Sequence, residues 1–186
     1  MAAEITKTKA VRVEFSATVG TIGTTNLVRL PEPASRQLPS RGQVAVRGSV
    51  NGYEFRTVIE PDGDRGHWMK VDPQLRQRAH VNPGDHVTIA LETTPDWPEP
   101  DVPDDLRAAL AGAPAHITEM WADITPMARW EWVRWVSATA NPATRQRRVE
   151  VTISKMENGK RRPCCFDLSA CTDPRLAKNG KLRSDN

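Results

Sequence analysis

The sequence is poor in cysteine, phenylalanine and tyrosine, and it contains no long apolar run. Three cysteines, two of them adjacent, are a weak basis for a disulfide framework and are typical of a reducing compartment. No segment approaches the roughly 18 apolar residues that cross a bilayer, and the N-terminal segment lacks the apolar core of a signal peptide. We therefore expect a cytoplasmic protein without a membrane span.

The net charge and the composition bear on whether the protein is globular and whether it binds nucleic acid. A net charge of +3 in 186 residues is too small to indicate a nucleic-acid-binding protein by itself. Hydrophobic residues make up 38% of the chain and charged residues 26%, which is typical of a globular protein on the polar side. With one Tyr and three Phe, a β-rich core has to consist mainly of Val, Ile and Leu.

Residues 11–95 show the pattern of short β-strands. Apolar side chains alternate with polar ones, and Asn51-Gly52 provides the two positive-φ positions of a type I′ hairpin turn. Residues 31–42 contain three prolines and are predicted to form a loop. Asp72 is a predicted N-cap with Pro73 at the first helical position, so one short helix interrupts the strands. Short strands with frequent turns predict a small antiparallel β-barrel with this one inserted helix.

The remaining segments differ from the barrel in composition. They are a frayed N-terminus at 1–10, an acidic, proline-rich strap with a short capped helix at 96–112, a helical segment at 113–162 and an irregular basic tail at 163–186. Proline stands at or next to each expected helix start in the helical segment, which is a common position for it. The fold class is therefore mostly β plus α, with a C-terminal appendage of three or four helices.

Several motifs resemble known families. The stretches Gly48–Arg56, Leu75-Arg76, Pro83–Val87 and Val102–Leu106 resemble a bacterial and archaeal domain of unknown function, itself similar to the double-split β-barrels that include AbrB- and MazE-type proteins. Trp135-Val136 and Pro142–Arg148 resemble the C-terminal segment of the YdeI/OmpD-associated family. The resemblance implies a double-split-like barrel over residues 11–95, and the second family name implies bacteriocin protection or an outer-membrane association. Neither resemblance implies catalytic residues. A swapped-hairpin homodimer is expected only by analogy with this type of barrel.

Three tryptophans lie close together in the helical segment. Trp130 and Trp132 point about 160° apart on a helix, whereas Trp132 and Trp135 share a face. One helix cannot bury all three against a single neighbour. Either this helix is sandwiched in the core, which the general preference of aromatic residues for burial favours, or one face binds a ligand or partner.

The last predicted helix and its exit are basic. Residues 141–165 contain seven Lys or Arg against two Glu, whereas residues 95–105 contain five acidic residues and no basic one. These two segments either lie together and compensate, or the basic helix forms a polyanion-binding surface. Arg145 and Arg148 share a face and are the candidate ligands of an anionic group.

Cysteine and histidine give weak signals. Cys164, Cys165 and Cys171 lack the paired spacing of a zinc site, so we expect free thiols and no metal. His67, His80 and other histidines lie near predicted turns, and no nucleophile motif accompanies them. We expect no cofactor and no enzymatic activity.

These observations favour a non-catalytic binding protein. A small molecule or peptide would bind where the barrel meets the helices, with Trp130, Trp132 and Trp135 stacking on it and Arg145 or Arg148 binding an anionic group. A protective, resistance-type role is the associated hypothesis. The alternative is a nucleic-acid-associated regulator that uses the basic helix and tail.

Overall fold

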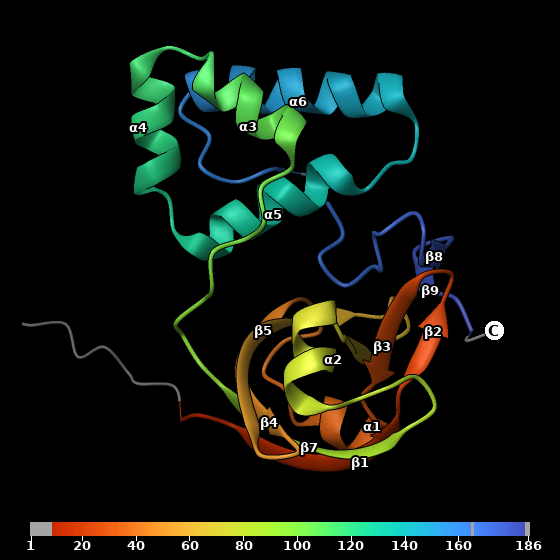
Figure 1. Cartoon of the computed structure of the whole chain (residues 1–186). Helices are drawn as coiled ribbons and strands as arrows, with labels where there is room; N and C mark the ends of the chain where they lie inside the picture. Colours follow the sequence, from red (N-terminus) through yellow and green to blue (C-terminus); the bar gives the residue numbers. More distant parts are fainter. Residues whose placement is uncertain (1–8, 165, 185–186) are drawn as a thin grey trace, which may run out of the picture.

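A strongly curled antiparallel sheet forms the lower half of the molecule (Figure 1). The computed structural model describes residues 9–164 and 166–184. Seven strands follow the order β1-β7-β4-β5-β6-β3-β2, so the two edge strands are consecutive in the chain. The strands are β1 Arg12–Thr18, β2 Gly20–Ile22, β3 Thr25–Arg29, β4 Val44–Val50, β5 Tyr53–Pro61, β6 His67–Lys70 and β7 His86–Thr93.

Alternation along the strands places the barrel core on the concave face. Val13 and Phe15 of β1 and Val87, Ile89 and Leu91 of β7 are all buried, while the residues between them point outward. The predicted hairpin is present, because Asn51 and Gly52 both have positive φ and join β4 to β5 in continuous register. The expected antiparallel, barrel-like fold is confirmed.

Two short helices, rather than the one expected, accompany the sheet. The expected helix is α2 (Pro73–Ala79), where the Asp72 carboxylate accepts a hydrogen bond of 2.8 Å from the Leu75 amide. The segment predicted as a loop contains the other, α1 (Glu32–Arg36). Five residues are too few to show a helical period, and the prolines around α1 favoured the wrong interpretation. The short strand β2 was also not predicted.

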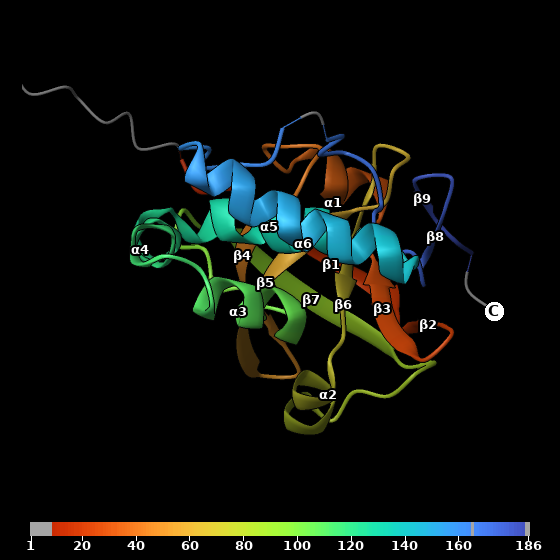
Figure 2. The same ribbon diagram turned by 90° about the horizontal axis from the view of Figure 1, so that it is seen from above.

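Four helices form the upper half of the molecule. They are α3 Asp104–Ala111, α4 Ala115–Asp123, α5 Pro126–Ser137 and α6 Pro142–Glu157. Thr125 and Asn141 cap α5 and α6 through side-chain oxygens that accept backbone amides, as the Thr-Pro and Asn-Pro pairs predict. α5 and α6 run side by side above the sheet (Figure 2). These helices have their own apolar core, which includes the fully buried Leu106, Ile117 and Trp132.

The C-terminal segment connects both halves. Its hairpin, β8 (Ala177–Lys178) and β9 (Lys181–Leu182), is the regular structure in a segment that we expected to be irregular. Cys171 and Leu176 of this segment form a third apolar cluster with Ile22, Leu27 and Trp68 of the barrel. The end of the chain therefore completes a core that the barrel strands begin.

Arg134 of α5 lies at the junction between the helical half, the C-terminal segment and the barrel. Its buried guanidinium donates to the carbonyl oxygens of Leu168 and Ala170 and, at 3.1 Å, to Thr172 Oγ1. It also lies 3.9 Å from the Glu60 carboxylate at the end of β5. Within the part of the chain that the structure describes, no helix is long and apolar enough to cross a membrane.

Candidate functional site

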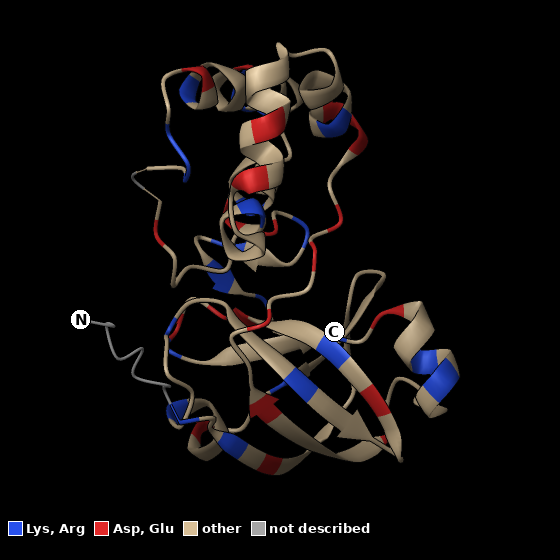
Figure 3. Cartoon of the chain, turned by 90° about the vertical axis from the view of Figure 1, so that its left-hand side faces the viewer, with Lys and Arg blue, Asp and Glu red and all other residues tan. Residues whose placement is uncertain are grey.

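The outer face of the strands β1, β7, β4 and β5 presents charged side chains in register. One row across the four strands is Arg12, Glu92, Arg47 and Arg56. The next outward-facing row, two residues further along each strand, is Glu14, Ala90, Ser49 and Glu54. Figure 3 turns this face toward the viewer, with acidic and basic positions on neighbouring strands.

Small side chains make this face hollow. Ala90 and Ser49 occupy the middle of the second row, while Glu14 and Glu54 stand at its two ends. The result is an open groove of about 1140 Å³. Tyr53 and the start of α2, with Asp72, Gln74 and Leu75, extend the lining beyond β5.

The charges in the groove are only partly neutralised within the molecule. Arg12 Nε lies 2.9 Å from a Glu92 carboxylate oxygen, and an Arg47 guanidinium nitrogen lies 2.8 Å from a carboxylate oxygen of Asp96 in the strap. The groove residues Glu14, Glu54 and Arg56 are exposed and form no ion pair with other residues in the ranges 9–164 and 166–184. They are therefore available to a ligand.

Arg47 and Arg56 face each other directly across the β4–β5 pair. Like charges at directly opposed positions destabilise a sheet, so folding alone does not favour two arginines here. Asp96 compensates Arg47, and Arg56 has no such partner among the described residues. An anionic group bound in the groove would relieve this repulsion.

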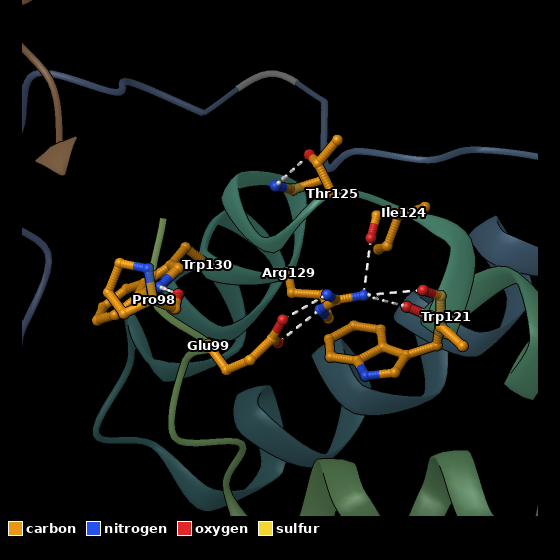
Figure 4. A network of polar contacts seen from close by, with 9 residues as sticks. Pro98, Glu99, Trp121, Ile124, Thr125, Arg129 and Trp130 are labelled. Carbon is orange, nitrogen blue, oxygen red and sulfur yellow. Dashed lines mark hydrogen bonds and ion pairs between the residues drawn. The ribbon is translucent and has the colours of Figure 1, made fainter. Parts of the chain in front are cut away.

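The predicted tryptophan site lies elsewhere, on α5. Trp132 is completely buried, and its indole nitrogen donates to the Arg161 carbonyl at 3.1 Å. Trp130 is half-buried and donates to the Pro98 carbonyl of the strap at 2.7 Å (Figure 4). Neither indole is among the groove-lining residues.

A second contact, between Arg129 and Glu99, joins the strap to the N-terminal half of α5. Arg129 binds both carboxylate oxygens of Glu99, at 2.8 and 2.6 Å (Figure 4). The same guanidinium donates to the carbonyls of Trp121 and Ile124 at the end of α4. Because C-terminal carbonyls of a helix lack intrahelical partners, this arginine both ends α4 and anchors the strap.

Trp135, Arg148 and Lys155 form a compact group between α5 and α6. The Trp135 ring lies 5.4 Å from the Arg148 guanidinium carbon and 5.6 Å from Lys155 Nζ. Trp132 contacts the same ring edge-on, with 6.1 Å between ring centroids. The structure thus brings together three of the five predicted site residues, and the cations over Trp135 belong to the protein itself.

Arg145 has an acidic partner in α3. Its guanidinium binds both carboxylate oxygens of Asp105, at 2.6 and 3.0 Å. This hydrogen bonding holds the pKa of Asp105 below its ordinary value. Arg161 and Arg162 likewise pair with Asp123 and Glu131. Acidic partners therefore compensate three of the seven cations in residues 141–165.

Comparison with known families agrees with this two-part architecture. Residues 3–91 match the model of a domain of unknown function, DUF1905, and residues 99–159 match the model of the bacteriocin-protection, YdeI or OmpD-associated family. The chain is a DUF1905 domain followed by a YdeI or OmpD-associated segment. No curated protein sequence matches the chain. The groove lies in the DUF1905 part, and the tryptophans lie in the YdeI or OmpD-associated part.

Histidines and cysteines contribute no comparable site. In the DUF1905 domain, His67 is buried, with its Nδ1 2.7 Å from Ser35 Oγ and its Nε2 3.1 Å from the Gly42 carbonyl oxygen. Burial and, to a lesser extent, the nearby Arg41 lower the pKa of His67. His80 is exposed in the left-handed cap of α2. No cluster of three or more His, Cys, Asp or Glu suited to a metal ion occurs among the described residues.

The two described cysteines are in different environments. Cys171 is buried at the junction, and burial together with Glu60 raises the pKa of its thiol to about 11. Lys155 Nζ lies 2.8 Å from Cys164 Sγ. Cys165 lies outside the described residues.

Sequence reasoning missed the groove residues because each looks like an ordinary solvent-facing strand residue. Ser49 and Ala90 are neighbours only through the β4–β7 pairing, which joins segments about 40 positions apart. The available signal was local, namely Arg or Glu at every second position around Val13 and Phe55. Such alternation predicts a solvated face, and it does not reveal which charges remain without partners.

Proposed function

We propose that this protein is a non-catalytic binding protein that takes a small molecule or peptide in the groove of the DUF1905 domain. The observation that carries the proposal is the groove itself, about 1140 Å³, with Arg56, Glu14 and Glu54 left without ion-pair partners in the described ranges. Concave sites with a few converging polar groups are the usual form of ligand sites. The name of the second family supports a protective role for the binding.

The groove is better suited to a ligand than the tryptophan helix. The indole nitrogens of Trp130 and Trp132 already donate to carbonyls of the protein, and Trp132 has no exposed surface. Arg145 is held by Asp105. The tryptophan site remains a prediction, which the experiment below separates from the groove.

A nucleic-acid-associated role is the alternative. It rests on the basic residues of α6 and the tail, of which Arg147 is exposed. The ion pairs of Arg145, Arg161 and Arg162 reduce the charge that phosphates would meet. The groove itself contains Glu14, Glu54 and Glu92, which repel a polyanion.

The test is ligand screening with a matched pair of variants. Arg56→Gln removes an unpaired groove charge, whereas Arg78→Gln removes an exposed arginine of α2 that does not line the groove. Both are screened with the parent protein against metabolites and short peptides by amide chemical-shift mapping and tryptophan fluorescence. We expect shifts at β1, β4, β5 and β7 that Arg56→Gln weakens and Arg78→Gln does not.

Other outcomes decide against the groove. Tryptophan quenching by a ligand that binds Arg56→Gln normally would place the site on α5. Retention on DNA or heparin that weakens with salt and is unaffected by Arg56→Gln would favour the nucleic-acid alternative. A protein that binds nothing in the panel would contradict the proposal.

A further inference from the structure

The two rows of the groove carry opposite charges at a fixed spacing. Arg56 and Glu54 are two residues apart on β5, and Arg12 and Glu14 are two residues apart on β1. Two strand residues span about 6.5 to 7 Å and point to the same face. Each side of the groove therefore presents one cation and one anion about 7 Å apart.

The charges nearly balance within the lining. Arg12, Arg47 and Arg56 are opposed by Glu14, Glu54, Glu92 and Asp72. Asp72 is engaged as the N-cap of α2, and Glu92 is engaged with Arg12. What remains for a ligand is a guanidinium on one row and carboxylates on the other. A polyanion or a polycation would gain from one row and be repelled by the other.

The arginine row is suited to a carboxylate. Arg56 stands directly opposite Arg47, which Asp96 already engages, so an anion bound by the Arg56 guanidinium also relieves the repulsion between the two arginines. A planar carboxylate fits the fork of donors on each guanidinium. The exposed Glu54 carboxylate, on the next row, is placed to accept from an ammonium or guanidinium of the same ligand.

We infer that the ligand is an extended peptide segment with an acidic and a basic side chain two positions apart. In an extended peptide, residues i and i+2 lie on the same side at the same spacing of about 7 Å. In a free amino acid a single carbon separates the α-ammonium from the α-carboxylate, which is too short to reach both rows. The inference rests on the proposed function, because it requires the groove to be the binding site.

The groove dimensions agree with a single extended chain. Four neighbouring strands cover about 14 Å from β1 to β5, at about 4.8 Å per strand. Ser49 and Ala90 provide a shallow floor between the charged ends. A peptide lying along the strand direction would place alternate side chains on the two rows and its other side chains toward solvent.

The test uses seven-residue peptides of identical composition with blocked termini, so that only the side chains carry charge. The matched peptide has Glu at its third and Lys at its fifth position in a Thr and Val background. The control peptide has the same Glu and Lys at adjacent positions, which place them on opposite sides of an extended chain. Binding to the full chain is measured by titration calorimetry, alongside the Arg56→Gln, Glu54→Gln and Arg78→Gln variants.

We expect the matched peptide to bind about tenfold tighter than the adjacent-charge peptide, which is the effect of one well-placed charged hydrogen bond. Arg56→Gln and Glu54→Gln each remove that advantage, and Arg78→Gln keeps it. If both peptides bind equally and Arg56→Gln weakens both, the groove is a binding site but the spacing inference is wrong. If neither peptide binds while a small molecule from the screen shifts the groove, the ligand class is wrong and the proposed function stands. Binding of single-stranded RNA that Arg56→Gln abolishes would replace the peptide by a polyanion.

Discussion

Removing the Arg134 guanidinium is expected to destabilise the whole molecule. Arg134→Met keeps the apolar stem and deletes a guanidinium that contacts α5's two neighbours, the C-terminal segment and Glu60 of β5. Breaking a buried ion pair by removing one partner costs about 3 to 5 kcal/mol. Because the Glu60 side chain keeps 22% of its exposure, we expect a value near the lower end, about 3 kcal/mol.

The pH dependence identifies the cause of this loss. Burial raises the pKa of Glu60 above its ordinary value of 4.5, and the charge of Arg134 opposes that rise. Without Arg134 the Glu60 pKa rises further. A raised carboxyl pKa means that the folded state binds more protons than the unfolded state, so stability falls as pH rises from 4.5 through the folded-state pKa. The cost of Arg134→Met should therefore be largest near pH 7 and shrink as the pH falls toward 4.5.

Urea unfolding at several pH values measures these free energies, with Arg147→Met as the control because Arg147 is exposed on α6. The double variant Arg134→Met with Glu60→Gln should recover more than about 1 kcal/mol, since it no longer leaves a charge without its partner. A single-variant cost below about 1 kcal/mol, or strictly additive effects in the double variant, would refute the view that this pair supports the junction.

Further predictions concern packing, thiol reactivity and the tryptophans. Gly48→Ala should cost about 1 to 3 kcal/mol in thermal or urea unfolding, because its Cβ would lie 2.5 Å from Phe55 Cζ and 2.8 Å from a Leu91 methyl carbon; an unchanged midpoint would show that this ring moves freely. Cys171 should resist alkylation at pH 8 in the folded protein, because its pKa of about 11 keeps the thiol protonated, and should react after unfolding; peptide mapping of labelled protein decides this. Trp132→Ala should cost about 3 to 5 kcal/mol because its ring is fully buried, and a smaller loss would indicate that the helical core collapses around the gap.

Local signals predicted most of the secondary structure. Asn51-Gly52 specifies the β4–β5 turn because both residues adopt positive φ at low cost. Asp72, Thr125 and Asn141 specify three helix starts through their side-chain oxygens. These features depend on residues close in sequence, so a single sequence reveals them.

The candidate site could not be predicted in the same way. The hollow depends on Ala90 lying beside Ser49, which only the long-range β4–β7 pairing decides. The Arg47–Arg56 pair, in contrast, follows from the register of the predicted Asn51-Gly52 hairpin. The sequence offered two alternatives for the basic helix, and the Arg145–Asp105 contact corresponds to the compensating one. The sequence also predicted that one helix cannot bury all three indoles against a single neighbour. It did not predict that Trp130 would donate to the Pro98 carbonyl of the strap. These contacts join segments far apart in the chain, and the periodicity of the sequence does not reveal them.

The C-terminal segment has a consequence for the order of events during synthesis. Ile22, Leu27 and Trp68 leave the ribosome well before Cys171 and Leu176, which cover them. Until those later residues arrive, the nascent barrel carries an apolar patch that is open to aggregation or chaperone binding. A protein shortened after residue 162 would keep that patch permanently, so it should be less soluble than the whole chain.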